Sequence, residues 1–282
     1  MPQYLLDPTV ALYVAAVVGL CVGSFLNVVI HRLPLMMERA WVRDCADLRG
    51  EEPPPATRYN LVVPRSACPS CGHRITALEN IPVVSWLVLR GRCSQCKTAI
   101  SARYPAVELL GGLVAVAAMW KFGPTWQGIA ACVMLWTLLA LTFIDFDTQY
   151  LPDDLTLPLL WAGLLANLNG LFTTLPEAVT GAVVGYLTLW SIYWLFKIIR
   201  GKEGMGHGDF KLLAALGAWL GWKMLPLIVL GSSVVGAFIG ISLVVFKGRD
   251  HNIPLAFGPY LAIAGMLALF FGQPFVKIYL PH

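Results

Sequence analysis

The sequence predicts an all-α polytopic membrane protein with about eight transmembrane helices and a small cytoplasmic zinc-ribbon-like domain between spans one and two. Three observations predict this class. First, 57% of the 282 residues are hydrophobic and only 13% are charged, whereas soluble domains carry about 25% charged residues. Second, apolar runs of bilayer-spanning length recur along the chain. Third, one long polar stretch, 31–103, separates the first run from the others and holds two paired-cysteine motifs.

The apolar runs divide the chain into membrane and extramembrane parts. The expected spans lie near 10–30, 104–120, 126–144, 155–171, 178–199, 210–222, 224–246 and 255–272. This predicts a first transmembrane helix at 1–30, a cytoplasmic four-cysteine zinc domain at 31–103 and a seven-helix membrane domain at 104–282. The N-terminus has no basic segment, and the first apolar run is too long for the core of a signal peptide, so we expect no removable signal.

The basic residues orient these spans. With 31–103 in the cytoplasm, the inside segments hold 17 of the 20 lysines and arginines, and the outside segments hold only Lys121, Lys223 and Lys277. Positively charged residues gather on the cytoplasmic side of membrane proteins, so this separation predicts that orientation. The same orientation places two acidic segments, 144–154 and 204–209, together on the cytoplasmic side.

Four of the seven cysteines form two Cys-x-x-Cys pairs, Cys68 with Cys71 and Cys93 with Cys96. Two such pairs with 21 residues between them predict a structural zinc ion bound by four thiolates, with no open position for catalysis. The alternative is a pair of disulfides or redox-active dithiols. The cytoplasmic placement argues against stable disulfides.

Two aspartates stand where expected membrane helices meet the cytoplasmic side. Asp145 directly follows the apolar stretch 138–144, and Asp209 ends the sequence Gly206-His207-Gly208-Asp209. An aspartate at the centre of a membrane helix costs about 2.5–3.5 kcal/mol, so such acids persist where they face a cavity or do chemistry. Two of them could share a proton and activate a water molecule against a peptide carbonyl, as in aspartic proteases.

The other acids of the first segment have simpler interpretations. Asp145 and Asp147 point about 200° apart on a helix, and Asp145 lies deeper in apolar sequence, so Asp145 is the preferred partner of Asp209. Asp147 is then a solvated loop acid, and Asp153 and Asp154 cap the next span. Asp145 lies at the C-terminal end of a helix and Asp209 at an N-terminal end, so helix dipoles predict that a shared proton resides mostly nearer Asp145.

These motifs resemble those of the bacterial type IV prepilin leader peptidase/N-methyltransferase family, relatives of the G-x-G-D membrane aspartyl proteases. The matching segments are 23–34, both Cys-x-x-Cys pairs, 103–108, 144–153, 204–211 and 257–262. The resemblance covers nearly the whole chain. It implies that the two catalytic aspartates of the family fall on Asp145 and Asp209, and that 104–282 is a peptidase domain.

The resemblance also implies substrates, cofactors and a location. The substrates would be prepilins of type IV pili and pseudopilins of type II secretion, cut after a glycine in the cytoplasm, with the new terminal residue, usually Phe, N-methylated by S-adenosylmethionine. The sequence has no Gly-rich strand-to-helix fingerprint for that methyl donor, so no residue is assigned to its site. The implied location is a bacterial inner membrane, with the active site on the cytoplasmic side and lipids as partners. No nucleic acid is expected.

Two other functions remain open from the residues alone. The acids of 144–154 could hold Mg²⁺ in a membrane transferase acting on a lipid phosphate, but this leaves Gly206–Asp209 unexplained. A transporter with a regulatory zinc domain would place charged or broken helices near the midplane, whereas these acids cluster at one edge.

Several further polar residues have two or more interpretations. Asn27 and His31 share a helix face and could line a substrate path or form interhelical hydrogen bonds. Glu108 could be a helix-start acid, a partner for an arginine or part of the active-site rim. His207 is expected to be a packed or solvated loop histidine, and Lys211 is expected to anchor at anionic headgroups.

Overall fold

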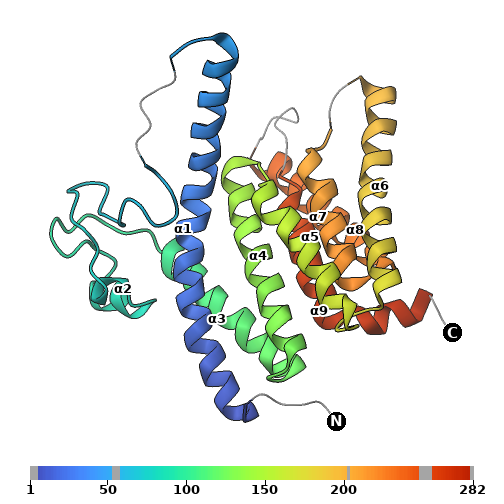
Figure 1. The fold of residues 1–282 in the computed structure, drawn as a ribbon, viewed down its shortest axis with the longest axis horizontal. Coiled ribbons are helices and arrows are strands. Elements are labelled where there is room, and N and C mark those ends of the chain that lie inside the picture. The colour runs from blue at the N-terminus through green and yellow to red at the C-terminus, as the bar shows by residue number, and fades with distance from the viewer. Residues whose placement is uncertain (1–5, 53–57, 202–203, 248–255, 280–282) are drawn as a thin grey trace. The chain divides into compact units, whose positions relative to one another are not determined.

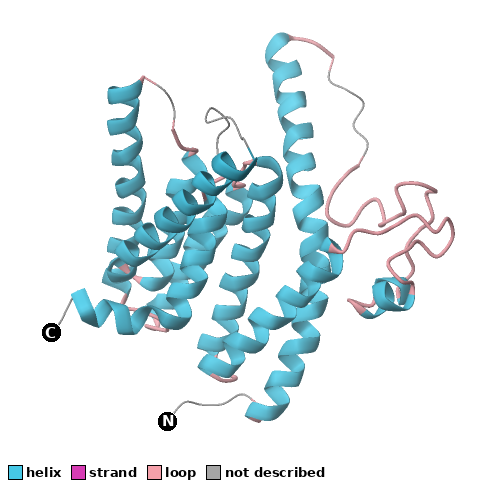
Figure 2. Ribbon diagram, turned by 180° about the vertical axis from the view of Figure 1, so that it is seen from behind, coloured by secondary structure: helices cyan, strands magenta, loops and turns pink. Residues whose placement is uncertain are grey.

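The computed structural model describes residues 6–52, 58–201, 204–247 and 256–279, and these form helices joined by loops (Figures 1 and 2). Each expected span coincides with a helix, which confirms the all-α class. The eight long helices are α1 (Pro8–Arg49), α3 (Arg103–Phe122), α4 (Trp126–Thr148), α5 (Asp153–Leu168), α6 (Leu175–Arg200), α7 (His207–Leu220), α8 (Leu225–Lys247) and α9 (Gly258–Tyr279). The shorter ones are η1 (Leu78–Asn80), α2 (Val84–Val88) and η2 (Trp222–Met224).

Six helices in the described part of the chain are long and apolar enough to cross a membrane. They are α1, α3, α4, α6, the stretch Trp222–Ser242 that includes most of α8, and α9. At 16 and 14 residues, α5 and α7 are shorter. The side chains of α7 from Leu212 to Leu220 are all buried, so α7 is surrounded by other helices rather than exposed around its circumference.

The chain forms two compact units, residues 1–125 and 126–282. In the first unit, α1 packs against α3 through glycines. A Cβ atom built on Gly19 would lie 2.6 Å from the Gly111 carbonyl oxygen, and one built on Gly23 would lie 2.7 Å from the Glu108 Cα. Glycines four residues apart let two membrane helices approach this closely. Asn27 adds an interhelical hydrogen bond from its side-chain amide to the Tyr104 carbonyl oxygen, at 3.0 Å.

Helix α1 continues well past residue 30, where the sequence predicts the first span to end. Its N-terminus is capped by Asp7, which accepts from the amides of Thr9 and Val10, and it ends at Gly50 in the left-handed conformation. The stretch after residue 31 is polar, but it contains good helix formers and no strong stop signal other than Pro34. A change of polarity therefore marks the end of the apolar segment and not the end of the helix.

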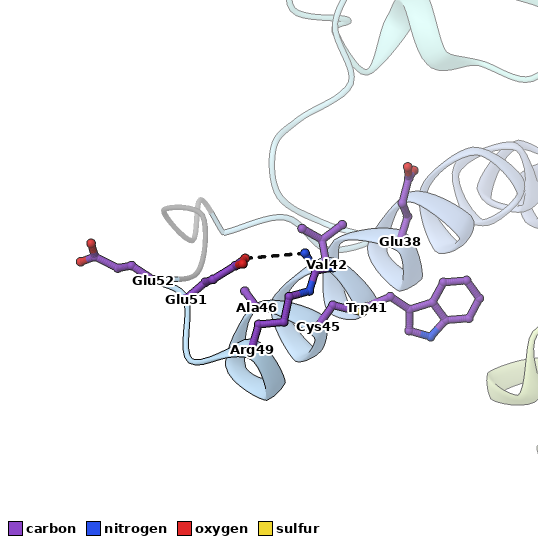
Figure 3. A pocket seen from close by; sticks show the side chains of 8 residues that line it. All are labelled: Glu38, Trp41, Val42, Cys45, Ala46, Arg49, Glu51 and Glu52. Atoms are coloured by element: carbon purple, nitrogen blue, oxygen red, sulfur yellow. Dashed lines mark ion pairs between the residues drawn. The ribbon is translucent and has the colours of Figure 1, made fainter.

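The extension of α1 carries a surface hollow of about 370 Å³ (Figure 3). Its lining residues are Glu38, Trp41, Val42, Cys45, Ala46, Arg49, Glu51 and Glu52. Arg49 and Glu51 form an exposed ion pair there at 3.7 Å. The hollow follows one side of a helix end and is lined by mixed charged and apolar side chains.

The second unit, residues 126–282, is built around α7. Helices α6 and α7 touch at Gly181, where an added Cβ would collide with the Gly217 carbonyl oxygen, and at Gly185, where it would lie 2.7 Å from the Leu213 carbonyl oxygen. On the α5 side, the Trp219 indole donates to the Leu159 carbonyl oxygen at 2.7 Å. Close backbone packing on one side and a buried polar contact on the other fix the position of α7.

Asn167 ties the C-terminal ends of α5 and α7 together. Its side-chain amide donates to the carbonyl oxygens of Ala218 and Trp219 at 2.8 and 3.0 Å, and its side-chain oxygen accepts from the amides of Phe172 and Thr173. The last carbonyl groups of a helix have no intrahelical partners. Asn167 satisfies two of them where water is excluded, so it is a structural residue of this unit.

Candidate active site and metal centre

Asp145 lies in the last turn of α4, at the end of a mostly apolar and buried stretch. Leu138, Leu141 and Ile144 have no exposed surface, and Asp145 itself is 4% exposed. One of its carboxylate oxygens, Oδ2, is buried without a hydrogen-bond partner. A buried carboxylate oxygen with no partner is costly in a folded protein and points to a functional role.

Asp209 lies in the first turn of α7 and is 6% exposed. Gly206 is the N-cap residue of this helix, and its backbone amide interacts with the Asp209 carboxylate. This is half of a capping box, in which an acid at the third helical position reaches back to the amide of the cap residue. The local sequence therefore holds the carboxylate at the positive end of the helix.

The two carboxylates lie at the same end of the second unit and interact electrostatically. Asp145 exerts like-charge repulsion on Asp209. Leu151, in the turn between α4 and α5, joins the elements around them: Cβ atoms added to Gly208 and Gly258 would lie 2.7 and 3.0 Å from its side chain. A Cβ on Gly258 would also lie 2.7 Å from Asp145 Oδ2. Only glycine fits beside this carboxylate.

The start of α9 changes the helix-dipole argument for the shared proton. Gly258 is the first residue of α9, and its backbone amide interacts with the Asp145 carboxylate. Asp145 thus lies at the C-terminal end of α4 and also at the positive, N-terminal end of α9. The dipoles do not separate the two acids as the sequence suggested, and they give no reason to place the proton nearer Asp145.

The neighbouring acids do not join this pair. Asp147 is exposed. Asp153 does not cap α5, whose cap residue is Pro152 without a side-chain hydrogen bond. Instead, Asp153 binds Lys211, whose ammonium lies 2.7 Å from both carboxylate oxygens. The expectation that Lys211 anchors at lipid headgroups is wrong, because this lysine connects the first turn of α7 to the first turn of α5.

His207 packs against aromatic rings, as expected for a packed histidine. Its ring centroid lies 5.2 Å from that of Tyr193 on α6 and 5.4 Å from that of Phe210. Phe210 is fully buried and also contacts Tyr193 at 5.7 Å. This cluster fixes the first turn of α7 against α6.

The four paired cysteines form one cluster in the first unit. The sulfur atoms of Cys68, Cys71, Cys93 and Cys96 all lie within 4.8 Å of one another. Cys68 and Cys96 are 3.7 Å apart, and Cys71 and Cys93 are 4.0 Å apart. Tetrahedral zinc with bonds of about 2.3 Å places its sulfur ligands about 3.8 Å apart. The cluster fits a structural zinc ion, and all four cysteines are free of disulfides.

Both cysteine pairs have the same backbone turn. The amides of Gly72 and Lys97, each four residues after the first cysteine of its pair, donate to the carbonyl oxygens of Cys68 and Cys93. Gly72 and Lys97 both have positive φ angles, 72° and 60°. The Gly after the first pair is a sequence signal for this turn, whereas Lys97 adopts it without such a signal.

Glu79 supports the metal site and was not identified from the sequence. It accepts from the amide and hydroxyl of Thr76 at 2.8 Å and contacts His73 Nε2 at 3.1 Å. Hydrogen bonding from Ser94, followed by that from Thr76, lowers the pKa of Glu79 to about 2. The residue connects both cysteine pairs, but nothing distinguishes its sequence context from that of a solvated acid.

The fold and these two sites define a multi-pass α-helical membrane protein with a four-cysteine domain and a buried pair of aspartates. Residues 17–122 match the bacterial peptidase A24 N-terminal domain, and residues 132–241 match the type IV leader peptidase family. The chain belongs to this family.

Curated relatives cover nearly the whole chain. It is 58% identical to a prepilin leader peptidase/N-methyltransferase of Aeromonas hydrophila over 94% of this chain and 92% of the relative. It is 56% identical to the protein of that name from Pseudomonas aeruginosa, over 93% and 91%, and 54% identical to that of Stutzerimonas stutzeri, over 97% and 95%. No solved structure matches the chain significantly.

Proposed function

We propose that this protein is a membrane aspartyl endopeptidase that removes the leader peptides of type IV prepilins and of pseudopilins, and that it then N-methylates the new terminus. The single observation that carries the peptidase proposal is the burial of two carboxylates, Asp145 and Asp209, at one end of the second unit, where Asp145 acts electrostatically on Asp209. The family and the names of the curated relatives support the same activity.

In this proposal, the two aspartates share one proton and hold the attacking water. The ionised carboxylate takes a proton from the water molecule. The oxygen of the water attacks the carbonyl carbon of the substrate glycine at the same time. The protonated carboxyl donates to the carbonyl oxygen, which gives a tetrahedral intermediate. Collapse of this intermediate breaks the C–N bond, and the departing amine receives the proton taken from water. The Gly206 amide lies beside the Asp209 carboxylate, and the Gly258 amide lies beside the Asp145 carboxylate.

We propose that this site faces the cytoplasm of a bacterial inner membrane. The support is the distribution of basic residues, 17 on one side and 3 on the other, since such residues gather on the cytoplasmic side. Asp145 lies in the last turn of α4, Asp209 lies in the first turn of α7, and Gly258 is the first residue of α9, all at one end of the second unit. A substrate with a basic leader outside the bilayer and an apolar helix within it would present its cleavage site at this level.

The zinc ion proposed for Cys68, Cys71, Cys93 and Cys96 has a structural role. Four thiolates complete its coordination, so it supplies no open position for substrate or water. The ion would hold the two turns of the first unit together, and Glu79 would brace them.

N-methylation requires a methyl donor, and S-adenosylmethionine is the donor that the family implies. The donor supplies a methyl group on a sulfonium centre to the free amine of the cleaved product. The described residues contain no strand followed by a Gly-rich turn and helix, so they do not present the common fingerprint for this donor. No step of the peptidase mechanism depends on it.

The rival magnesium-dependent transferase is disfavoured by the placement of the acids. It requires several carboxylates of 144–154 on one face, but Asp153 is engaged by Lys211 and Asp147 is exposed, whereas Asp145 is buried. A transporter would need buried charges near the middle of the bundle, and the buried aspartates lie at one end of it.

The proposal predicts separate losses in two single variants. Asp145→Asn and Asp209→Asn should each lower the cleavage rate of a prepilin in membranes by about 10²–10⁴-fold, because each removes one member of the acid–base pair. Asp147→Asn is the matched control and should cleave normally. The Asp145→Asn and Asp209→Asn variants should still methylate a precleaved pilin. Normal cleavage by either variant at wild-type protein levels would contradict the assignment.

A further inference from the structure

The polar stretch between the first two spans contains a cluster of exposed apolar side chains. Leu78, Ile81, Val84, Leu87 and Val88 fall within eleven residues, on η1, on α2 and between them, and their exposed fractions range from 41% for Ile81 to 77% for Leu78. We call these five residues the α2 patch. The other side of α2 is packed: the Trp86 indole donates to the Ile100 carbonyl oxygen, and its ring lies against Gly91.

A hydrogen bond fixes the depth of α2 relative to the membrane helix α3. The amide of Val83, the cap residue of α2, donates to Glu108 Oε2 at 2.7 Å. Glu108 is the sixth residue of α3, about 8 Å along its axis from Arg103 at 1.5 Å per residue. The 20 residues of α3 give a length of about 30 Å, which matches the hydrocarbon core of a bilayer. Val83 therefore lies at or just inside the edge of that core.

The depth of Val83 also explains why an acid occupies position 108. A backbone amide near the hydrocarbon region must have a hydrogen-bond acceptor, because water is scarce there. Glu108 supplies the acceptor to Val83. Figures 1 and 2 agree with this placement, since α2 lies level with α3 and with the N-terminal half of α1, and not at the level of the C-terminal end of α1.

The charges around the α2 patch suit an anionic lipid surface. Arg90 and Arg92 follow α2 directly and are exposed. The nearby acid, Glu79, is turned toward His73 and Thr76. Apolar residues that enter the boundary between headgroups and acyl chains, with basic residues beside them, are the signature of interfacial membrane binding. The patch also lies next to α3, whose Leu109 and Leu113 are exposed apolar residues of a membrane span.

We propose that the α2 patch is a lipid-binding surface that holds the zinc domain partly inserted in the membrane interface, rather than free in solution between spans one and two. Leu78, Ile81, Val84, Leu87 and Val88 enter the edge of the bilayer, and Arg90 and Arg92 bind anionic headgroups. The cysteine cluster, which is connected to η1 through Glu79, is thereby kept at the membrane surface.

The test is photocrosslinking in the full-length protein. A benzophenone amino acid replaces Leu87, and in a matched protein it replaces Leu48, an 88% exposed leucine on the α1 extension. Both proteins are placed in nanodiscs of phosphatidylethanolamine and phosphatidylglycerol, irradiated, and analysed for lipid adducts by mass spectrometry. We expect at least ten times more lipid adduct at position 87 than at 48.

Two controls exclude misfolding of the labelled protein as the cause of the result. Zinc content checks that the label leaves the domain folded, and if the label at Leu87 disturbs it, the same label at Val88 replaces it. Lipid adduct at the level of Leu48, or crosslinks from position 87 to peptides of 126–282 in place of lipid, would overturn the proposal.

Discussion

The burial of individual side chains within the protein decides which acids can take part in catalysis. Asp145 and Asp147 are two residues apart in one helical turn, yet Asp145 is buried and Asp147 is exposed. Periodicity and the preceding apolar stretch predict this difference. The contacts of Asp145 with α9 are not predictable in that way, because Gly258 is more than a hundred residues further along the chain and meets the carboxylate only through the packing of the helices.

Lys211 and Asp153 provide a prediction at the residue scale. Their ion pair is partly exposed, at 30% and 52%, so it should contribute only about 0.2–1 kcal/mol to stability. It nevertheless joins the first turns of α5 and α7, which flank the site. Lys211→Gln and Asp153→Asn should each lower kcat for prepilin cleavage several-fold, and the double variant should be no worse than either single one.

The measurement is kcat and KM for the two single variants and the double variant, with thermal unfolding as the check on folding. A shared positioning role predicts strong coupling between the two positions. Additive losses of kcat in the double variant would show that the residues act independently.

At the scale of secondary-structure elements, polar contacts inside apolar sequence decide how the helices pack. Asn167 stands in the sequence as one polar residue near the end of an apolar run, which is typical of a span end. In the structure its side chain satisfies the last carbonyl groups of α7 and the amides of the following turn. Sequence reasoning could not find this role, because the partners are 5 to 52 residues away.

Asn167→Leu should destabilise the second unit, because it leaves two buried carbonyl groups without their side-chain partner at about 1–3 kcal/mol each, and two part-buried amides lose their acceptor as well. Thermal unfolding in detergent checks this, and we expect a clear loss of stability in the variant. Asn169→Ala is a matched control at an exposed position and should have little effect. Equal unfolding of the two variants would contradict the role of Asn167.

The cysteine domain gives a second prediction at this scale. Removal of zinc by a strong chelator, or the double substitution Cys68→Ser and Cys71→Ser, should loosen the segment 58–100, because the metal supplies much of the folding free energy of such small sites. Limited proteolysis should then cut this segment faster, while cleavage of prepilin partly survives. Retention of stoichiometric zinc in the double variant would contradict the four-thiolate site.

At the scale of the whole molecule, the apolar runs and the basic residues predict most of the architecture. The positions of the eight long helices follow from runs of hydrophobic residues, and the family follows from the motifs. The extension of α1 to Arg49 does not follow, because helix propensity continues where hydrophobicity stops. The burial of α7 follows only in part: its sequence is apolar from Leu212 to Leu220, but an apolar stretch looks the same whether lipid or protein surrounds it.

The central claim is that Asp145 and Asp209 meet at one end of the second unit, and thiol crosslinking tests it most directly. Asp145→Cys and Asp209→Cys are combined in a protein in which Cys21, Cys45 and Cys132 are replaced by Ser or Ala, with zinc protecting the other four cysteines. A short bifunctional thiol reagent should join positions 145 and 209 as efficiently as positions 153 and 211, whose side chains touch. Position 145 paired with a cysteine at Leu220, at the far end of α7, should not crosslink. If positions 145 and 209 fail to crosslink while 153 and 211 succeed, the shared site of the two aspartates is contradicted.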